Sequence, residues 1–152
     1  LIKADLGTEI LAITSDGWDT HADQGGSEEL GYQSLQHADF AGTLAAFHKD
    51  MTDNREQDLV LTMTEFGRTA KENASGGTDH GNAGCWLALG NVAGGIHGDW
   101  PGLATHQLYQ KRYLRHTIDY RDLMGEVLSA HLGFPDLGTV LPDHTYNPVG
   151  FL

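Results

Sequence analysis

The chain has 152 residues, 39% of them hydrophobic, and its 21 acidic and 9 basic residues give a formal net charge of -12. This length suits one globular domain, which we expect to span residues 1–152. The negative charge argues against a nucleic acid partner, because the protein would repel a phosphate backbone. With Cys85 as the single cysteine there is no internal disulfide or thiolate cluster, so a metal ion would be bound by imidazole and carboxylate groups.

No apolar run approaches the roughly 18 to 20 residues of a transmembrane helix, so we expect no membrane span. The first ten residues, LIKADLGTEI, lack the charged start and apolar middle of a signal peptide. They also lack an initiator methionine and run almost directly into a predicted strand. We therefore expect the chain to be a fragment of a longer protein.

The first part of the chain predicts a strand, a loop and a helix. Residues 9–14, EILAIT, form a short apolar run followed by turn residues, which is typical of a buried strand. The loop GWDTHADQGG comes next. Ser27 can then cap a helix whose apolar stripe runs from Phe40 to Met51, and we expect this helix to end near residues 53–54.

The rest of the chain predicts two more strands and a final helix. Residues 58–64, DLVLTMT, and residues 85–92, CWLALGNV, are the strand candidates, and a long glycine-rich loop separates them. The final helix is predicted over residues 119–131, with Gly133 as its stop. From Pro135 onward we expect an irregular tail.

This order of elements predicts an α/β fold with a mainly parallel sheet. Glycine makes up 20 of the 152 residues, about twice the usual share of ~7%, and the excess lies in loops that follow predicted strands. Ligands of open α/β sheets bind at such strand ends. The polar residues of these loops are therefore the candidates for chemistry.

Asp79 and His80, in the sequence GGTDHG, are the first candidates, since carboxylate oxygens and imidazole nitrogens are common ligands of zinc and similar ions. Neighbouring residues of an extended strand point opposite ways, so both side chains can reach one ion only where the chain turns. The flanking glycines permit such a turn. The alternative is a polar turn in which Asp79 bonds locally and His80 is exposed.

Asp19 and His21, in the sequence GWDTH, supply a second carboxylate and imidazole after another predicted strand. They are two residues apart, so in an extended segment they project to the same side. Together with Asp79 and His80 they offer two oxygens and two nitrogens from two loops. The alternative is that Asp19 caps a turn and Trp18 packs on the surface.

Glu65 and Arg68 lie just past the strand predicted over residues 58–64, in the sequence EFGRT. The guanidinium is suited to bind a phosphate or sulfate group in bidentate fashion, and Glu65 to act as a ligand or a base. A structural ion pair between the two is an equally good alternative. Among the remaining histidines we keep His97 and His116 as reserve ligands.

Three common catalytic motifs are missing from the sequence: the G-x-S-x-G elbow, the phosphate loop ending in Gly-Lys-Ser/Thr, and H-E-x-x-H. A hydrolase with a serine triad is therefore disfavoured.

The ordered set GWDTHADQ, TEFGRT, GTDHGN, GGIHGDWPGL and TIDYRDLMGEVLSAHLG resembles the C-terminal part of the bacterial family called domain of unknown function 1501. That family is usually grouped with the alkaline phosphatase superfamily, which includes the sulfatases. The resemblance spans nearly the whole chain, and the ordered set is far more specific than any one motif.

The resemblance implies a three-layer α/β/α sandwich with metal ions at the carboxyl edge of a mainly parallel sheet. It also implies hydrolysis of phosphate or sulfate esters, with two divalent ions about 4 Å apart in many such enzymes. Asp79 and His80 resemble the superfamily's Asp-His ligand pair, and Asp19 and His21 resemble ligands that follow an earlier strand. Members are commonly exported, so the resemblance implies a periplasmic or secreted protein.

Two departures limit what the resemblance implies. The superfamily's Asp-His pair follows its strand at once, whereas here Glu65 ends the strand and Asp79 comes about a dozen residues later. Glu65 is therefore an alternative occupant of the ligand position. The Ser or Thr nucleophile and the other ligands normally come from an N-terminal half, which is not in this sequence.

The sequence thus predicts a metal-dependent hydrolase acting on a small anionic phosphate or sulfate ester. Asp19, His21, Asp79 and His80 would bind divalent metal, zinc first and manganese or calcium as alternatives. Glu65 would support the metal and Arg68 would meet the substrate. The other hypothesis is a structural or binding module that keeps the fold without catalysis.

Overall fold

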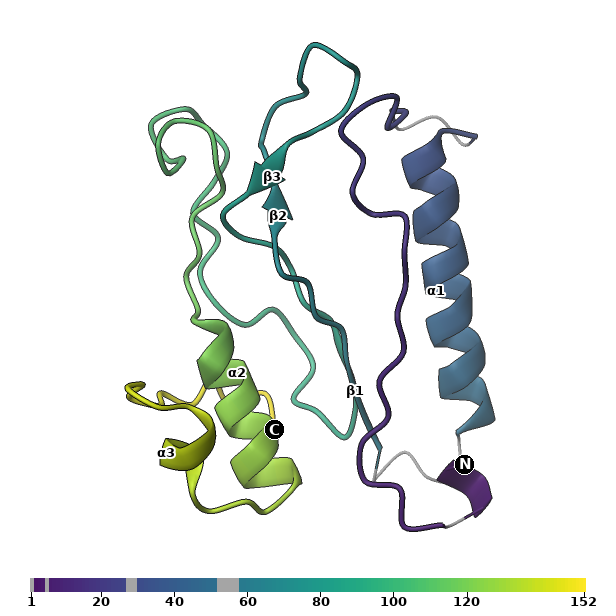
Figure 1. The fold of residues 1–152 in the computed structure, drawn as a ribbon, viewed down its shortest axis with the longest axis vertical. Coiled ribbons are helices and arrows are strands. Elements are labelled where there is room, and N and C mark those ends of the chain that lie inside the picture. Colours follow the sequence, from purple (N-terminus) through teal and green to yellow (C-terminus); the bar gives the residue numbers. More distant parts are fainter. Residues whose placement is uncertain (1, 5, 27–29, 52–57) are drawn as a thin grey trace.

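A computed structural model describes residues 2–4, 6–26, 30–51 and 58–152 of the chain. Figure 1 shows one long helix on one side, a narrow band of short strands in the middle and a cluster of shorter helices near the C-terminus. The described elements, in chain order, are η1 (Ile2–Ala4), α1 (Tyr32–Asp50), β1 (Leu59–Leu61), β2 (Gly67–Arg68), β3 (His80–Gly81), β4 (Ala88–Gly90), α2 (Tyr120–Glu126), the π-helix η3 (Val127–His131) and α3 (Leu137–Val140).

The strands form two small antiparallel sheets. β1 pairs with β4, with Leu59 opposite Gly90, and β2 pairs with β3, with Arg68 opposite His80. Because β2 and β3 lie within the connection from β1 to β4, the four strands form one nested hairpin, which needs no crossover helix. The fold is mixed α/β, but the mainly parallel sheet and the three-layer α/β/α sandwich predicted from the sequence are wrong for the described residues.

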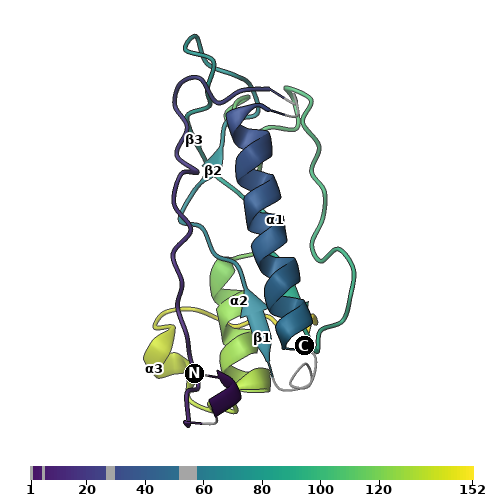
Figure 2. The same cartoon turned by 90° about the vertical axis from the view of Figure 1, so that its right-hand side faces the viewer.

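The strand predicted over residues 9–14 is also not formed. This segment carries no strand, and the residues Ile10 and Ile13 are 73% and 83% exposed. Figure 1 shows it passing between α1 and the central strands, and Figure 2 shows it along one edge of the molecule. A groove of about 1280 Å³, lined by Leu11, Phe40 and Val60 among others, lies between it and β1. An apolar run alone does not make a strand when no second strand lies within hydrogen-bonding distance.

The predicted first helix is confirmed as α1. The proposed cap Ser27 and the proposed end at residues 53–54 lie outside the described residues. The helix begins after Gly31 and is closed by the N–H of Met51, which donates to the carbonyl of Phe47 at 2.9 Å. Since Met51 is one of the few buried apolar side chains of the described chain, this end of the helix is anchored in the small core.

The second predicted helix is confirmed as α2 continuing into η3. Asp119 caps it by accepting a hydrogen bond from the N–H of Arg121 at 2.9 Å. Gly133 follows the helix with a φ of 65°, the left-handed conformation that stops helices and favours glycine. The tail expected to be irregular from Pro135 contains one short helix, α3.

The described core is small, with Met51, Leu108 and Phe151 as its buried hydrophobic residues. Within the described residues, no helix combines the length and apolarity that a bilayer crossing requires.

Candidate metal centre

Two loops from distant parts of the sequence meet beside the β2–β3 pair. Three backbone hydrogen bonds of 2.8 to 3.1 Å join residues 20–24 to residues 75–78. The first loop is also tied to α1, because the hydroxyl of Tyr32 donates to the carbonyl of Gly17 at 3.1 Å. Both segments are thus fixed relative to each other by main-chain contacts, which hold the side chains between them in place.

Asn73 and two glycines shape the second loop. The Asn73 side-chain oxygen accepts from the N–H of Ser75 and of Gly77, and its amide donates to the carbonyl of His21 at 2.9 Å. Gly76 has a φ of 69°, and a Cβ on Gly77 would collide with the backbone of His21. The turn that the glycines were expected to permit is present, and it lets the two backbones approach closely.

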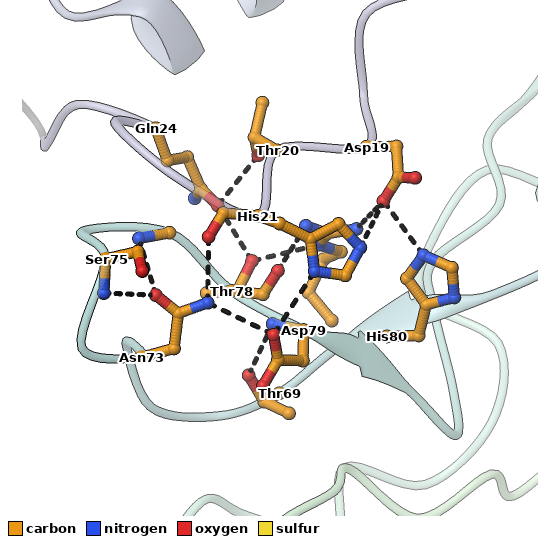
Figure 3. A network of polar contacts seen from close by, with 12 residues as sticks. Asp19, Thr20, His21, Gln24, Thr69, Asn73, Ser75, Thr78, Asp79 and His80 are labelled. Atoms are coloured by element: carbon orange, nitrogen blue, oxygen red, sulfur yellow. Dashed lines mark hydrogen bonds and ion pairs between the residues drawn. The ribbon is translucent and has the colours of Figure 1, made fainter.

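Asp19, His21 and His80 form a cluster with one ligand atom each, and these three atoms all lie within 4.8 Å of one another. Oδ1 of Asp19 is 3.0 Å from Nε2 of His21 and 2.8 Å from Nε2 of His80. The close view in Figure 3 shows both rings turned toward this carboxylate. The three side chains are about half exposed, so the cluster faces solvent on one side.

Asp79 lies behind His21 rather than within this group of three. Its Oδ1 is 3.2 Å from Nδ1 of His21 and accepts a hydrogen bond from the Asn73 amide at 3.1 Å (Figure 3). Its Oδ2 is 2.6 Å from Nη2 of Arg112. The hydrogen bond from Asn73, followed by that from His21, lowers the pKa of the Asp79 carboxyl. Asp79 is therefore held as a carboxylate.

The ring of His21 lies between two carboxylates, and this has a chemical consequence. Nε2 faces Asp19 and Nδ1 faces Asp79, at 3.0 and 3.2 Å. A neutral imidazole carries one N–H, so it can donate to only one of the two oxygens. At the other contact the ring nitrogen turns its lone pair toward a carboxylate, an arrangement that a divalent cation held by His21 and Asp19 would stabilise.

The donor set fits zinc better than the alternatives. Two imidazole nitrogens and one carboxylate oxygen match a zinc site with three protein ligands and one open position. Calcium prefers six to eight oxygen ligands, and nitrogen ligands do not suit it.

Arg68 holds the same oxygen of Asp19 that faces the two rings. Its Nη1 donates to Oδ1 of Asp19 at 2.6 Å, its Nε to the hydroxyl of Thr78 at 2.9 Å, and its Nη2 to the carbonyl of Thr78. The bond from Arg68, followed by that from His80, lowers the pKa of the Asp19 carboxyl. The alternative ion pair with Glu65 is not formed. The Glu65 side chain is exposed, and the cluster of three does not include it.

Some neighbours of the cluster carried no signal in the sequence. Phe66 stacks on the ring of His80, with centroids 3.9 Å apart and planes 9° apart. Arg112 comes from a separate loop, and nothing in the sequence YQKRY marks it as part of this site. The reserve ligands bond elsewhere: His97 to the carbonyl of Ala93, and His116 to the Asn82 side chain.

Comparison with known families adds one relationship. A family model described as protein of unknown function (DUF1501) matches residues 3–143, which include all the residues of the cluster. No curated protein and no solved structure matches the chain. On this match over nearly its whole length, the chain belongs to the DUF1501 family.

Proposed function

We propose that the chain contributes the metal centre of a metal-dependent hydrolase that acts on phosphate or sulfate esters. The observation that carries the proposal is the convergence of one carboxylate and two imidazoles within 4.8 Å, where His21 lies between two carboxylates. Asp19, His21 and His80 would hold a divalent ion, with zinc the best fit to the donors. Membership of the alkaline phosphatase superfamily, with export, belongs to the same proposal.

The residues of the site have separable roles in this function. A divalent ion held by these three protein groups would supply Lewis acidity for the hydrolysis of an ester. Asp19 provides the anionic ligand, and Arg68 keeps its oxygen directed at the two rings. Phe66 covers one face of His80 and limits the ring's rotation.

The charges of the site make it a better place for an anionic substrate than the rest of the surface. Asp19 and Asp79 are matched by Arg68 and Arg112, so the four formal charges of this network cancel. The chain as a whole carries -12. A bound divalent cation would therefore leave the site positive, and an anionic ester would be attracted to it rather than repelled.

The test separates metal binding from turnover. Zinc content is measured by mass spectrometry of the purified protein, and hydrolysis of p-nitrophenyl phosphate and p-nitrophenyl sulfate is followed with and without a chelator. We expect one zinc per chain, chelator-sensitive hydrolysis, and loss of both in Asp19→Ala and His80→Ala. Asp99→Ala and His106→Ala are the matched controls, because both residues are exposed and lie outside the cluster.

The results also decide between the two functional hypotheses. Zinc bound through Asp19 and His80 without hydrolysis of either ester would support the alternative hypothesis, a metal-binding module without catalysis. Absence of any bound metal would remove the metal centre and the hydrolase proposal together.

A further inference from the structure

Asp79 and Arg112 form a chain of contacts that ends at His21. Nη2 of Arg112 lies 2.6 Å from Oδ2 of Asp79, and Oδ1 of the same carboxylate lies 3.2 Å from Nδ1 of His21. The other ring nitrogen, Nε2, is the one that faces Asp19 in the cluster. The Asp79 carboxylate thus contacts the Arg112 guanidinium through Oδ2. Through Oδ1 it contacts Nδ1 of His21, the ring nitrogen that faces away from the cluster.

The loop that carries Arg112 is built to place it there. The carbonyl of Arg112 accepts a hydrogen bond from the N–H of Ala70 at 3.1 Å, and Tyr113 forms a β-bridge with Thr69. The loop is therefore docked on the chain just after β2. Gln110 and Lys111 adopt φ values of 52° and 60°, which cost conformational energy for residues other than glycine. A tight turn with two such residues persists where the surrounding contacts hold it, which is consistent with a defined position for Arg112.

The contacts of Asp79 keep its side chain from also binding an ion in the cluster. Its Oδ1 already receives His21 and the Asn73 amide, and its Oδ2 receives Arg112. The backbone is tied as well, because the N–H of Thr69 donates to the carbonyl of Asp79 at 2.9 Å. Turning this carboxylate toward an ion beside Asp19 would break its contacts with His21 and Asn73.

We propose that Asp79 is a positioning residue for His21 and that Arg112 holds Asp79 in place. Asp79 accepts the Nδ1–H of the ring, which selects the tautomer whose Nε2 lone pair points into the cluster. A carboxylate behind a metal-binding histidine fixes the ring and makes it a stronger ligand. This inference rests on the proposed metal site and changes the role of Asp79 from a ligand to the support of one.

Zinc affinity, measured by competition with a chelator, gives opposite signs for the two possible roles of Arg112. Acting only as a nearby positive charge, Arg112 would repel the ion, so Arg112→Ala would tighten zinc binding. Acting through Asp79, it supports a ligand, so the same substitution weakens binding. We expect weaker binding in Arg112→Ala and no weakening in the control Arg115→Ala, which removes the same charge from an exposed residue three positions away.

Asp79 variants complete the affinity test. We expect Asp79→Ala to bind one zinc per chain about 10- to 100-fold more weakly, which is the usual cost of losing an outer partner of a ligand. Asp79→Asn should bind zinc with an affinity between those of Asp79→Ala and the unchanged protein, because its amide oxygen still accepts from Nδ1 while its NH2 group cannot accept from Arg112. Unchanged affinity in Asp79→Ala, or tighter binding in Arg112→Ala, would overturn the inference.

Exchange of the Nδ1 proton of His21 with solvent tests the positioning role separately, because it would not change if Asp79 acted as a metal ligand. In ¹⁵N NMR spectra of the zinc-loaded protein we expect this proton to be protected from exchange, and to lose protection in Asp79→Ala. If zinc does not bind to the unchanged protein, the metal site and this inference both fall. If zinc binds with the same affinity and the proton is equally protected in Asp79→Ala, only the positioning role falls.

Discussion

Nε2 of His80 lies 2.8 Å from Oδ1 of Asp19, although 61 residues separate them in the chain. The contact depends on the main-chain bonds between residues 20–24 and 75–78, because these bonds hold together the two loops that carry the half-exposed side chains. An exposed polar contact of this kind contributes little stability by itself. The loop docking therefore creates the site, and the side-chain contacts follow from it.

Gly77 offers a direct test of this dependence. A methyl group at this position would collide with the backbone of His21, so Gly77→Ala should force the two loops apart. We expect the free energy of unfolding to fall by about 1 to 3 kcal/mol, which is typical of overpacking. The free energy of zinc binding should fall by a larger fraction than the free energy of unfolding. Thermal unfolding and zinc titration measure the two effects.

The control for Gly77 is Gly94→Ala, since a Cβ at Gly94 meets no atom within 4 Å. This variant should keep both the melting temperature and the zinc affinity of the unchanged protein. Normal zinc affinity in Gly77→Ala would show that the site does not need the close approach of the loops.

Arg68 is expected to respond even to a conservative change. Its fork of N–H groups joins Asp19 to Thr78 through three bonds, a geometry that the single ammonium group of lysine does not reproduce. In Arg68→Lys we expect the pKa of Asp19 to rise toward its ordinary value and the melting temperature to fall. ¹³C NMR of the Asp19 carboxyl group checks the pKa, and an unaltered titration would contradict the assigned role.

We expect Phe66 to influence zinc binding through its contact with His80. Its ring stacks on the imidazole at 3.9 Å, so Phe66→Ala leaves one face of His80 without a neighbour and gives the ring more freedom. Ordering that ring again on metal binding costs free energy, and we expect zinc to bind about 5- to 10-fold more weakly, which corresponds to roughly 1 kcal/mol. Phe66→Tyr keeps the stacked ring and should bind zinc like the unchanged protein.

The candidate site was predictable from the sequence because its residues are concentrated in two short motifs. The spacing of Asp19 and His21, and the glycines around Asp79 and His80, indicated two donor-rich loops, and the structure brings these four residues together. The sequence did not indicate which carboxylate faces the cluster and which lies behind His21. That difference depends on Arg112, which reaches Asp79 from a third loop with no periodic or motif signal.

The fold was predicted less well, for a reason that the strands make clear. Short apolar runs correctly indicated β1 and β4, but such runs carry no information on which partner a strand takes or in which direction. The run at residues 9–14 is as apolar as the run at 58–64, yet it lines a groove and forms no ladder. Helices were easier, because an apolar stripe such as the one from Phe40 to Met51 and a stop such as Gly133 are local signals.

Glu126 links the end of α2 to the C-terminal residues and gives a prediction outside the metal centre. Its two carboxylate oxygens accept four backbone N–H groups, from residues 149–152, at 2.7 to 2.9 Å. Burial of Glu126 by itself raises the pKa of this carboxyl, but the four N–H groups together bring it below the ordinary value. The folded chain therefore favours the charged form of Glu126.

The direction of the pH dependence follows from this lowered pKa. A carboxyl with a lower pKa in the folded than in the unfolded chain stabilises the fold above its unfolded pKa, and this contribution is lost as pH falls through the folded pKa. Glu126→Gln removes the charge and puts an amide donor toward N–H groups, so we expect a loss of about 2 kcal/mol near pH 7. Thermal unfolding of both proteins from pH 7 to pH 3 should show the difference shrinking at the acid end. A difference that stayed constant over this range would mean that the carboxylate charge of Glu126 does not hold the C-terminal residues in place.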